Sequence, residues 1–467
     1  MFSKKEINPR MPTTDLRPFF NPKSLVLIGA SERPGSIGGM LASHLLEGDF
    51  KGELYFTNIK RDTIFNHKCY PNLEALPADP ELAVIAIPSR FVPAELENCA
   101  KRNIHHVIVL SGGFSEVGNK DLEEELISVA KKHDIRIIGP NCAGIVSTHT
   151  NMVAAMENNY IKGGLSIVSQ SGALAGSMML RATSEDLGID KWISFGNASD
   201  VEEAELLKYL AEETDSPTKV IFLYVEGATH GRKLIESMKN ASKLKPVIFL
   251  KGGRSAIGNK AAMTHTASLG GDPKIYQSVA KQAGAIWVES LDEAFDTYAA
   301  LAPYLDKGGK RVAIVTNSGG PGVLISDNLD FMNLELNQPS KRLREQLVDL
   351  PEACPRENPF DLLGDANPER YELTLRALAH SGEFDTIITV MVPPGDADVN
   401  GVAKVMVDIA GEQHNTAIIG CLLAGEKVRE AINTLRENDI PTFPTPKRAA
   451  WGAHALNMWK NIKEKRD

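Results

Sequence analysis

The chain contains few aromatic residues, few cysteines and no long hydrophobic run. Aromatic residues make up 6% of its 467 residues, and its five cysteines include no CxxC pair and no cysteine–histidine spacing typical of zinc. This cysteine usage indicates a reducing compartment, so we expect a cytoplasmic protein without a metal site of its own. The first residues form no apolar signal segment, and no run reaches the roughly 18 apolar residues of a membrane span. We therefore expect no membrane partner.

The charge balance lacks a basic excess. The formal net charge is -9, and the Lys and Arg residues are scattered along the chain. A nucleic-acid surface needs concentrated basic residues, so nucleic acid is excluded as the main partner and any anion must be bound locally. With 43% hydrophobic and 24% charged residues, the composition is that of a globular protein and excludes disordered and fibrous classes.

Short β-branched runs recur along the chain and predict an α/β fold. Each is followed by a Gly, Ser or Pro turn and then by helical periodicity, which is typical of βαβ units in a buried parallel sheet. The runs are 24–29, 82–87, 106–110, 135–139, 164–169, 220–225, 247–251 and 311–316. The length suggests about three domains. We predict three consecutive α/β domains, the first doubly wound, over residues 1–147, 148–306 and 307–467.

The first run leads through a Gly/Ser turn, Gly29 to Gly38, into a helix. Free backbone N–H groups and the helix dipole would face an anion there, so we expect a nucleotide-like phosphate. The spacing is not GxGxxG, and the second strand ends at Asn58, followed by Lys60 and Arg61, where an NAD site would have an acidic residue. Those two basic residues favour an additional phosphate. The alternative is a glycine turn that binds no phosphate.

Three further loops of small residues follow strands in the same domain. They are Pro88-Ser89, residues 111–118 and residues 139–144. Ligands of open α/β sheets lie beyond the carboxyl ends of the strands, so these loops point to one crevice. Small residues there would let a long, thin ligand approach the backbone.

Two strand-to-helix turns, in the second and third domains, predict phosphoryl-binding sites. Each offers hydroxyls and exposed amides without a basic side chain. The candidate phosphate-binding residues are Ser169, Gln170, Ser171, Gly172, Ser318, Gly319 and Gly320. The alternative for either turn alone is simple N-capping by Ser171 or Ser318.

His265 lies in residues 259–271, a segment with little apolar periodicity, so we expect it on a loop. A neutral imidazole is a good nucleophile toward phosphorus, and its second nitrogen needs an acceptor that fixes the tautomer. Glu226, after the run 220–225, is the candidate acceptor. We predict that His265 carries a phosphoryl group. For the other histidines a structural or solvated role is the expectation.

Taken together, these segments resemble the α subunit of ADP-forming acyl-CoA (acetyl-CoA) synthetases, in the nucleoside-diphosphate-forming acyl-CoA ligase superfamily that includes succinyl-CoA synthetase. The resemblance spans nearly the whole chain. It rests on an ordered set of motifs: 27–31 with 35–38, 139–142, 169–174, 251–255 leading into Thr264-His-Thr266, 358–362 and 441–446.

The resemblance implies a Rossmann-like CoA-binding domain followed by two flavodoxin-like domains, the first carrying the phosphohistidine. It assigns His265 as the phosphorylated residue and Glu226 as its orienting carboxylate. The implied CoA-binding residues are Gly29, Ala30, Ser31, Gly35, Ser36, Ile37, Asn58, Lys60, Pro88, Ser89, Asn141 and Cys142. In such enzymes an acyl phosphate forms, CoA attacks it, and the phosphoryl group passes through the histidine to ADP.

The resemblance also implies a partner. No ATP-grasp region is recognisable in the chain, so we expect the site for ADP or ATP with Mg²⁺ on a separate β subunit, in a heterotetramer. The small substrates would be a carboxylic acid, CoA and phosphate. The chain departs from its relatives at Ala267, where they often have glycine. Alanine at this position would stiffen the histidine loop.

Two other functions compete with this interpretation. One is a CoA-binding regulator that has lost catalysis, against which His265 and Glu226 argue. The other is an NAD-dependent dehydrogenase, which the residues after Asn58 and the lack of a hydride-transfer site oppose. The acyl group, the direction of the reaction and the choice of ADP or GDP stay open.

Overall fold

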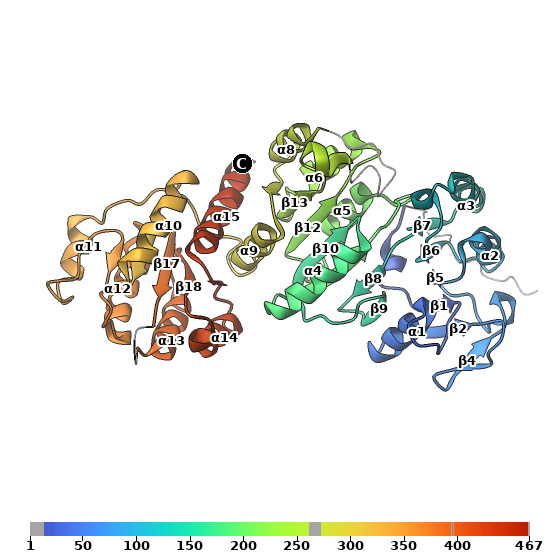
Figure 1. Ribbon diagram of the computed structural model, residues 1–467, viewed down its shortest axis with the longest axis horizontal. Helices are drawn as coiled ribbons and strands as arrows, with labels where there is room; N and C mark the ends of the chain where they lie inside the picture. Colours follow the sequence, from blue (N-terminus) through green and yellow to red (C-terminus); the bar gives the residue numbers. More distant parts are fainter. Residues whose placement is uncertain (1–13, 261–271, 394, 396, 466–467) are drawn as a thin grey trace, which may run out of the picture. The chain divides into compact units, whose positions relative to one another are not determined.

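The computed structural model describes residues 14–260, 272–393, 395 and 397–465, and its strands form three sheets (Figure 1). The chain divides into two compact units. The first runs to Val247 and includes Lys251–Ala283, and the second consists of Ile248–Leu250 and the chain from Gly284 onward. The predicted α/β class is confirmed, while the predicted domain boundaries near 147 and 306 stay predictions.

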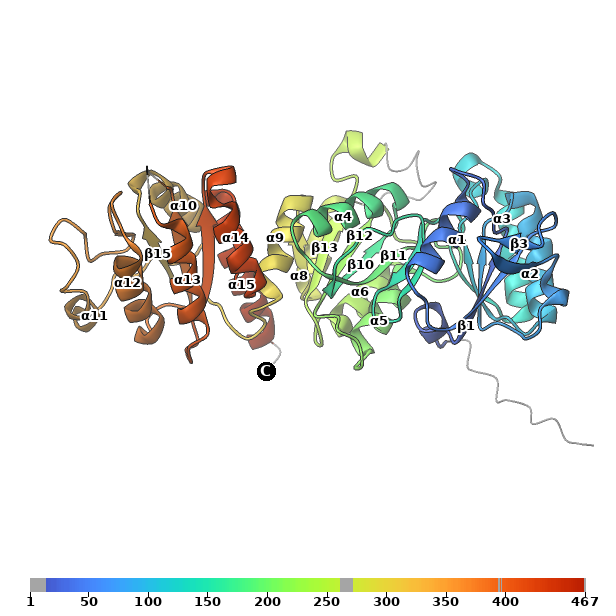
Figure 2. The ribbon, with the colours of Figure 1, turned by 90° about the horizontal axis from the view of Figure 1, so that it is seen from below.

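The first sheet has the strand order β3-β4-β2-β1-β5-β6-β7. Apart from the antiparallel β3–β4 hairpin, its strands pair in parallel. The order β4-β2-β1-β5-β6-β7 is that of a Rossmann sheet. Its strands are β1 (Ser24–Ile28), β2 (Glu53–Thr57), β3 (Thr63–Ile64), β4 (His67–Tyr70), β5 (Leu82–Ile85), β6 (His106–Val109) and β7 (Arg136–Ile138). Figure 2 shows helix α1 (Ile37–Glu47) on one face, and α2 (Val92–Lys101) and α3 (Lys120–His133) on the other.

The second sheet has the order β14-β13-β12-β10-β11-β8-β9. Its parallel strands follow the flavodoxin order, and the antiparallel hairpin β8–β9 extends one edge. The strands are β8 (Gly144–Ser147), β9 (Met152–Ala155), β10 (Lys162–Ser169), β11 (Ile189–Ser194), β12 (Val220–Val225), β13 (Val247–Lys251) and β14 (Ile286–Val288). The helices are α4 (Gly172–Ser184), α5 (Glu203–Glu212), α6 (Gly231–Ala241), α8 (Pro273–Gln282) and α9 (Leu291–Leu301). Figure 2 shows α4 on the face opposite α5 and α6.

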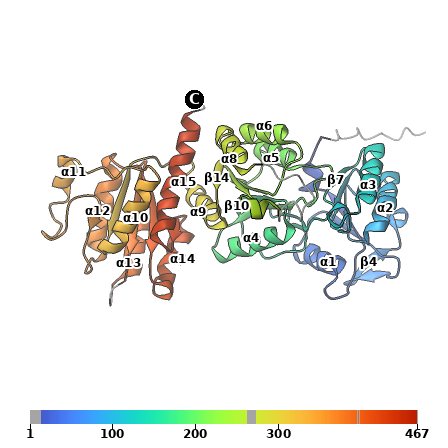
Figure 3. The same cartoon turned by 45° about the horizontal axis from the view of Figure 1, so that its top comes forward.

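The third sheet is parallel throughout, in the order β16-β15-β17-β18-β19. This is again the flavodoxin order. The strands are β15 (Val312–Thr316), β16 (Phe360–Asp361), β17 (Thr386–Met391), β18 (Ala417–Leu422) and β19 (Thr442–Phe443). The helices are α10 (Gly319–Phe331), α11 (Lys341–Gln346), α12 (Pro368–Ser381), α13 (Val399–Ala410), α14 (Arg429–Glu437) and α15 (Pro446–Glu464). Helix α10 packs beside α15 (Figure 3), and α12 packs on α13.

Continuous burial explains why these strands read as unbroken apolar runs. All residues of β1, β5, β6, β15 and β18 are buried, because helices cover both faces of a parallel sheet. Ligand chemistry is therefore left to the loops at the strand ends. Among the described residues, no helix is long and apolar enough to cross a membrane.

Candidate active site

The turn after β1 presses the start of α1 against the strand. Gly29 has φ +89°, and a Cβ placed at Gly38 would lie 2.0 Å from the carbonyl oxygen of Gly29. Only glycine fits this approach. The first amides of α1 are thereby presented at the carboxyl end of the sheet, which is the geometry that binds a phosphate group.

Side chains predicted from the sequence hold this turn in shape. Ser36 caps α1, because its Oγ accepts a hydrogen bond from Gly39 N at 3.2 Å. Asn58 Nδ2 donates to the carbonyl oxygen of Ala30 at 2.7 Å, and Asn58 Oδ1 accepts from Lys60 N at 2.8 Å. The structure thus brings the ends of β1 and β2 together. Asn58 is engaged by the turn backbone, so it shapes the site through the loop.

The three other predicted loops also lie at strand ends of the first sheet. Pro88 and Ser89 begin the 3-10 turn after β5, and a Cβ placed at Gly113 would lie 2.7 Å from Ser89 Oγ. Asn141 N donates to the carbonyl oxygen of Ser111 at 2.9 Å, which links two of these loops.

Cys142 turns its thiol inward. Its Sγ lies 3.3 Å from the carbonyl oxygen of Val109, and burial raises the pKa of this thiol to about 12. The thiol therefore stays protonated at neutral pH and is no nucleophile. Cys142 can serve a ligand only through its backbone.

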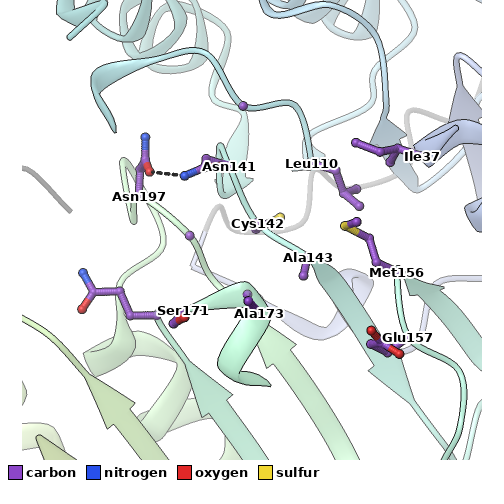
Figure 4. Close-up of a pocket in the computed structure, with 14 residues that line it drawn as sticks. Ile37, Leu110, Asn141, Cys142, Ala143, Met156, Glu157, Ser171, Ala173 and Asn197 are labelled. Carbon is purple, nitrogen blue, oxygen red and sulfur yellow. Dashed lines mark hydrogen bonds between the residues drawn. The ribbon is translucent and has the colours of Figure 1, made fainter. Parts of the chain in front are cut away.

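A cavity of about 410 Å³ in the first unit joins these loops to the start of α4 (Figure 4). Its lining residues are Ile37, Leu110, Gly112, Asn141, Cys142, Ala143, Met156, Glu157, Gln170, Ser171, Gly172, Ala173, Gly196 and Asn197. Figure 4 shows the apolar side chains of Ile37, Leu110 and Met156 grouped together, while the amides of Asn141 and Asn197 meet at another part of the wall. The cavity therefore offers both an apolar wall and a polar wall.

The first predicted phosphate-binding turn belongs to this cavity. Ser171 is the N-cap of α4, with its Oγ 3.4 Å from Leu174 N, and Ser169 Oγ donates to the carbonyl oxygen of Ser171 at 2.9 Å. Capping by Ser171 is thus real, as the alternative interpretation held. It leaves the N–H groups at the start of the helix facing the cavity, because no preceding turn accepts them.

Gln170 connects this turn to Glu226. Its side-chain oxygen accepts hydrogen bonds from Glu226 N at 2.7 Å and from Gly227 N at 3.2 Å. Tyr224 Oη donates to Glu226 Oε1 at 3.2 Å, and the Nζ of buried Lys251 donates to the backbone oxygen of Glu226 at 2.6 Å. Glu226 is itself buried, 8% exposed, so its carboxylate has a fixed place beside the turn. His265 lies outside the described residues.

A second cavity, of about 250 Å³, shares Gln170 and Asn197 with the first and was not anticipated from the sequence. Glu203 lines it and is only 4% exposed. Burial, with a smaller contribution from the charge of Glu202, raises the pKa of Glu203 to about 7. The burial of Glu203 was not predicted from the sequence, because Glu202 and Glu203 follow an ordinary polar turn.

Asn197 is the other residue that the sequence analysis missed. Its Nδ2 donates to Glu116 Oε2 at 2.8 Å and to Glu123 Oε2 at 3.0 Å, and its Oδ1 accepts from Asn141 Nδ2 at 3.2 Å. It thereby ties a loop of the first sheet to the end of β11 in the second. Its place three residues after the end of a buried strand is the signal that could have identified it.

The second predicted phosphate-binding turn lies in the second unit. Ser318 caps α10 without a side-chain hydrogen bond, unlike Ser171, and Thr316 Oγ1 donates to its carbonyl oxygen at 2.7 Å. Gly319 and Gly320 are exposed, and a Cβ at Gly320 would meet nothing within 4 Å. The combined use of both turns stays a prediction. Among the described residues, no group of His, Cys, Asp and Glu side chains is arranged to hold a metal ion.

Two family models match parts of the chain. Residues 23–148 match the family model of a CoA binding domain, and residues 162–301 match that of a succinyl-CoA ligase like flavodoxin domain. The chain is 36% identical to the α subunit of acetate–CoA ligase [ADP-forming] II from Pyrococcus furiosus, covering 95% of this chain and 98% of that protein. It is 35% identical to the isoenzyme I α subunit from the same organism, with 96% and 99% covered.

A solved structure agrees across the whole length. The dinucleotide forming acetyl-coenzyme A synthetase 1 of Ca. Korarchaeum cryptofilum, in complex with phosphate and ADP, superposes with a TM-score of 0.92 at 32% identity, covering 97% of this chain and 98% of that chain. The two Pyrococcus relatives are named as α subunits, which implies that members of this group work with a partner subunit. The chain therefore belongs to the family of ADP-forming acetate–CoA ligase α subunits.

Proposed function

We propose that the chain is the catalytic α subunit of an ADP-forming acyl-CoA synthetase of the acetate–CoA ligase type. It would interconvert acyl-CoA, ADP and phosphate with a carboxylic acid, CoA and ATP. The observation that carries this proposal is the larger of the two cavities described above, which joins the α1 turn, the Asn141 loop and the first turn of α4. A long substrate bound at the α1 turn can thus reach a phosphoryl site without leaving the first unit.

CoA is the substrate that fits the first-sheet loops. The amides at the start of α1 suit its diphosphate, and the exposed side chains of Lys60 and Arg61 suit a further phosphate. The glycines and small residues of the loops after β5, β6 and β7 leave room for the pantetheine arm. The Rossmann-like turn thus binds a phosphorylated ligand in this proposal, and the alternative of a turn without phosphate is set aside.

The first turn of α4 would bind the phosphoryl group that is transferred. An oxygen of inorganic phosphate attacks the thioester carbonyl, the CoA thiolate leaves, and an acyl phosphate forms. The amides at the start of α4 stabilise the oxygens of the phosphoryl group, because they are fixed dipoles that need no reorganisation. Gln170 keeps the turn and Glu226 in register by its two hydrogen bonds.

His265 would then take the phosphoryl group. Its nitrogen attacks phosphorus, the P–O bond to the acyl group breaks, and the carboxylate leaves. Glu226 would accept the hydrogen bond of the other ring nitrogen and stabilise the phosphorylated ring. The proposed residues for CoA and phosphate are those that the sequence predicts. Ser318, Gly319 and Gly320 are proposed as a phosphate-binding turn of the second unit.

We further propose that the partner is an ATP-grasp β subunit in a heterotetramer, which supplies the site for ADP or ATP and Mg²⁺. This rests on the single-chain acetate–CoA ligase [ADP-forming] from Methanocaldococcus jannaschii, of which this chain matches only 63% at 36% identity. The remaining 37% of that protein (100 − 63) lies outside the match. A cytoplasmic location is proposed with it.

The test is a labelling experiment on the purified chain. We expect acetyl-CoA with ³²P-phosphate to place acid-labile, base-stable label on the protein, and we expect His265→Ala to abolish the label while CoA binding persists. His105→Ala is the matched control, because His105 is only partly buried and lines neither cavity, and its Nδ1 lies 3.0 Å from the carbonyl oxygen of Asp134. Label that survives in His265→Ala would assign the phosphoryl carrier to another residue.

A further inference from the structure

Glu157 places a carboxylate in the wall of the larger cavity. It follows β9 and is partly buried, and it has no hydrogen-bond or ion-pair partner within the ranges that the structure describes. Figure 4 shows its side chain below Met156, on the same side of the cavity. Neither the CoA loops nor the phosphoryl-binding turn needs this charge.

Helix α4 leaves space for the carboxylate. A Cβ placed at Gly176 would lie 3.1 Å from both Cγ and Oε1 of Glu157, so any larger residue at 176 would displace the side chain. Gly176 follows Gly172 by four residues and therefore lies on the same face of the helix. The rise between them is about 6 Å. The Glu157 carboxylate accordingly lies about one turn from the amides that would bind the reacting phosphoryl and carboxyl groups.

An unpaired carboxylate at this place discriminates between ligands. It accepts a hydrogen bond from a hydroxyl group, and such a bond to a charged group is stronger than one between neutral groups. It also repels a second carboxylate that comes close to it, because charges are poorly screened in a partly desolvated cavity. An apolar tail gains neither effect.

We propose that Glu157 selects the acyl group, favouring acids with a hydroxyl on the third carbon and rejecting dicarboxylic acids. The inference rests on the proposed function, because it places the acyl carbonyl at the first turn of α4. A hydroxyl three bonds from the carboxyl carbon, plus the length of one hydrogen bond, spans about the 6 Å of that helical turn. Ile37, Leu110 and Met156 supply the apolar wall along the carbon chain.

Three CoA thioesters with acyl groups of four carbons test this selection: butyryl-CoA, 3-hydroxybutyryl-CoA and succinyl-CoA. Each is incubated with the full chain and ³²P-phosphate, and the second-order rate constant for labelling is taken from the dependence of the initial labelling rate on thioester concentration. We expect 3-hydroxybutyryl-CoA to exceed butyryl-CoA by about 10-fold or more, and succinyl-CoA to fall below butyryl-CoA by about 10-fold or more.

Two substitutions separate charge from hydrogen bonding. Glu157→Gln removes the charge and keeps an acceptor, so the succinyl/butyryl ratio should rise about 10-fold and part of the hydroxyl preference should remain. Glu157→Met removes both, so the hydroxyl preference should vanish. Glu185→Gln is the matched control, since Glu185 is paired with Arg181 at the far end of α4 and the ratios should not change.

The possible outcomes test the selection by Glu157 separately from the proposed function on which it rests. Absence of label with all three thioesters contradicts the proposed function. Label that forms with equal rate constants from all three thioesters in the wild type contradicts only the selection by Glu157, and leaves the proposed function standing. An equal loss with all three in both Glu157 variants also overturns it, because Glu157 would then act on a group that the three share.

Discussion

The close approach of α1 to β1 makes Gly38 a position where one methyl group should impair CoA binding. In Gly38→Ala the new Cβ would lie 2.0 Å from Gly29 O and 3.1 Å from Gly29 C. Both neighbours are backbone atoms, so no side chain can turn aside. A normal contact is about 3.5 Å, and the helix must therefore move away by roughly 1–1.5 Å.

That movement has two costs. Leu41, Ala42 and Leu45 of α1 are buried beside the sheet, and shifting them from close packing should cost about 1–3 kcal/mol, or roughly 2–4 °C in Tm for each kcal/mol. The amides at the start of α1 move with the helix, away from the position that would bind the CoA diphosphate. A displacement of this size should weaken CoA binding by about 10-fold or more.

Calorimetric titration with CoA and thermal unfolding measure the two effects. Gly231→Ala is the matched control, because Gly231 also begins a helix of the first unit, and a Cβ there would meet nothing within 4 Å. It should leave CoA affinity unchanged and stability equal or slightly higher. If Gly38→Ala kept the wild-type Kd for CoA, the placement of the diphosphate at the start of α1 would be wrong; an unchanged Tm would refute the packing argument.

Two further predictions concern buried carboxyl groups, one in β11 and one at the start of α5. Asp190 is fully buried; although burial raises its pKa, the hydrogen bond from His149 and the charge of Lys191 hold that pKa well below its ordinary value. A carboxyl group whose pKa is lower in the folded state stabilises the protein above its unfolded-state pKa, near 3.9, and this stabilisation is lost as pH falls. In urea unfolding, Asp190→Asn should therefore lower the free energy of unfolding by about 3 kcal/mol at pH 7 and by less at pH 3. An equal cost at both pH values would contradict this. Glu203 has the opposite sign, because burial raises its pKa to about 7: its folded form is increasingly penalised as pH rises from about 4.5 to 7. At pH 8, Glu203→Gln should therefore raise Tm and increase the free energy of unfolding by at most about 3 kcal/mol, whereas at pH 5 it should change neither. The same gain at both pH values would show that packing, not charge, is responsible.

The apolar pattern of the sequence predicted strands in each of the three sheets, but it did not predict the equally buried β17 and β18. The runs 220–225 and 247–251 coincide with β12 and β13, and the other predicted runs differ from their strands by one or two residues at the ends. A parallel strand buried on both faces must be apolar throughout, so its signal is local. The glycine turns after β1 and β10 were also predictable from the sequence, because the residues of each turn determine its backbone geometry.

The tertiary structure alone decided which of these turns share a cavity and which side chains have a role there. Ile37 and Gly172 are far apart in sequence, yet both line one cavity. The role proposed for Glu157 depends on its position next to Gly176, which the sequence does not show. Ser171 and Ser318 look alike in sequence, but only Ser171 caps its helix with its side chain. Such relations depend on the packing of distant segments and on the hydrogen bonds that burial enforces, which no local pattern of residues encodes.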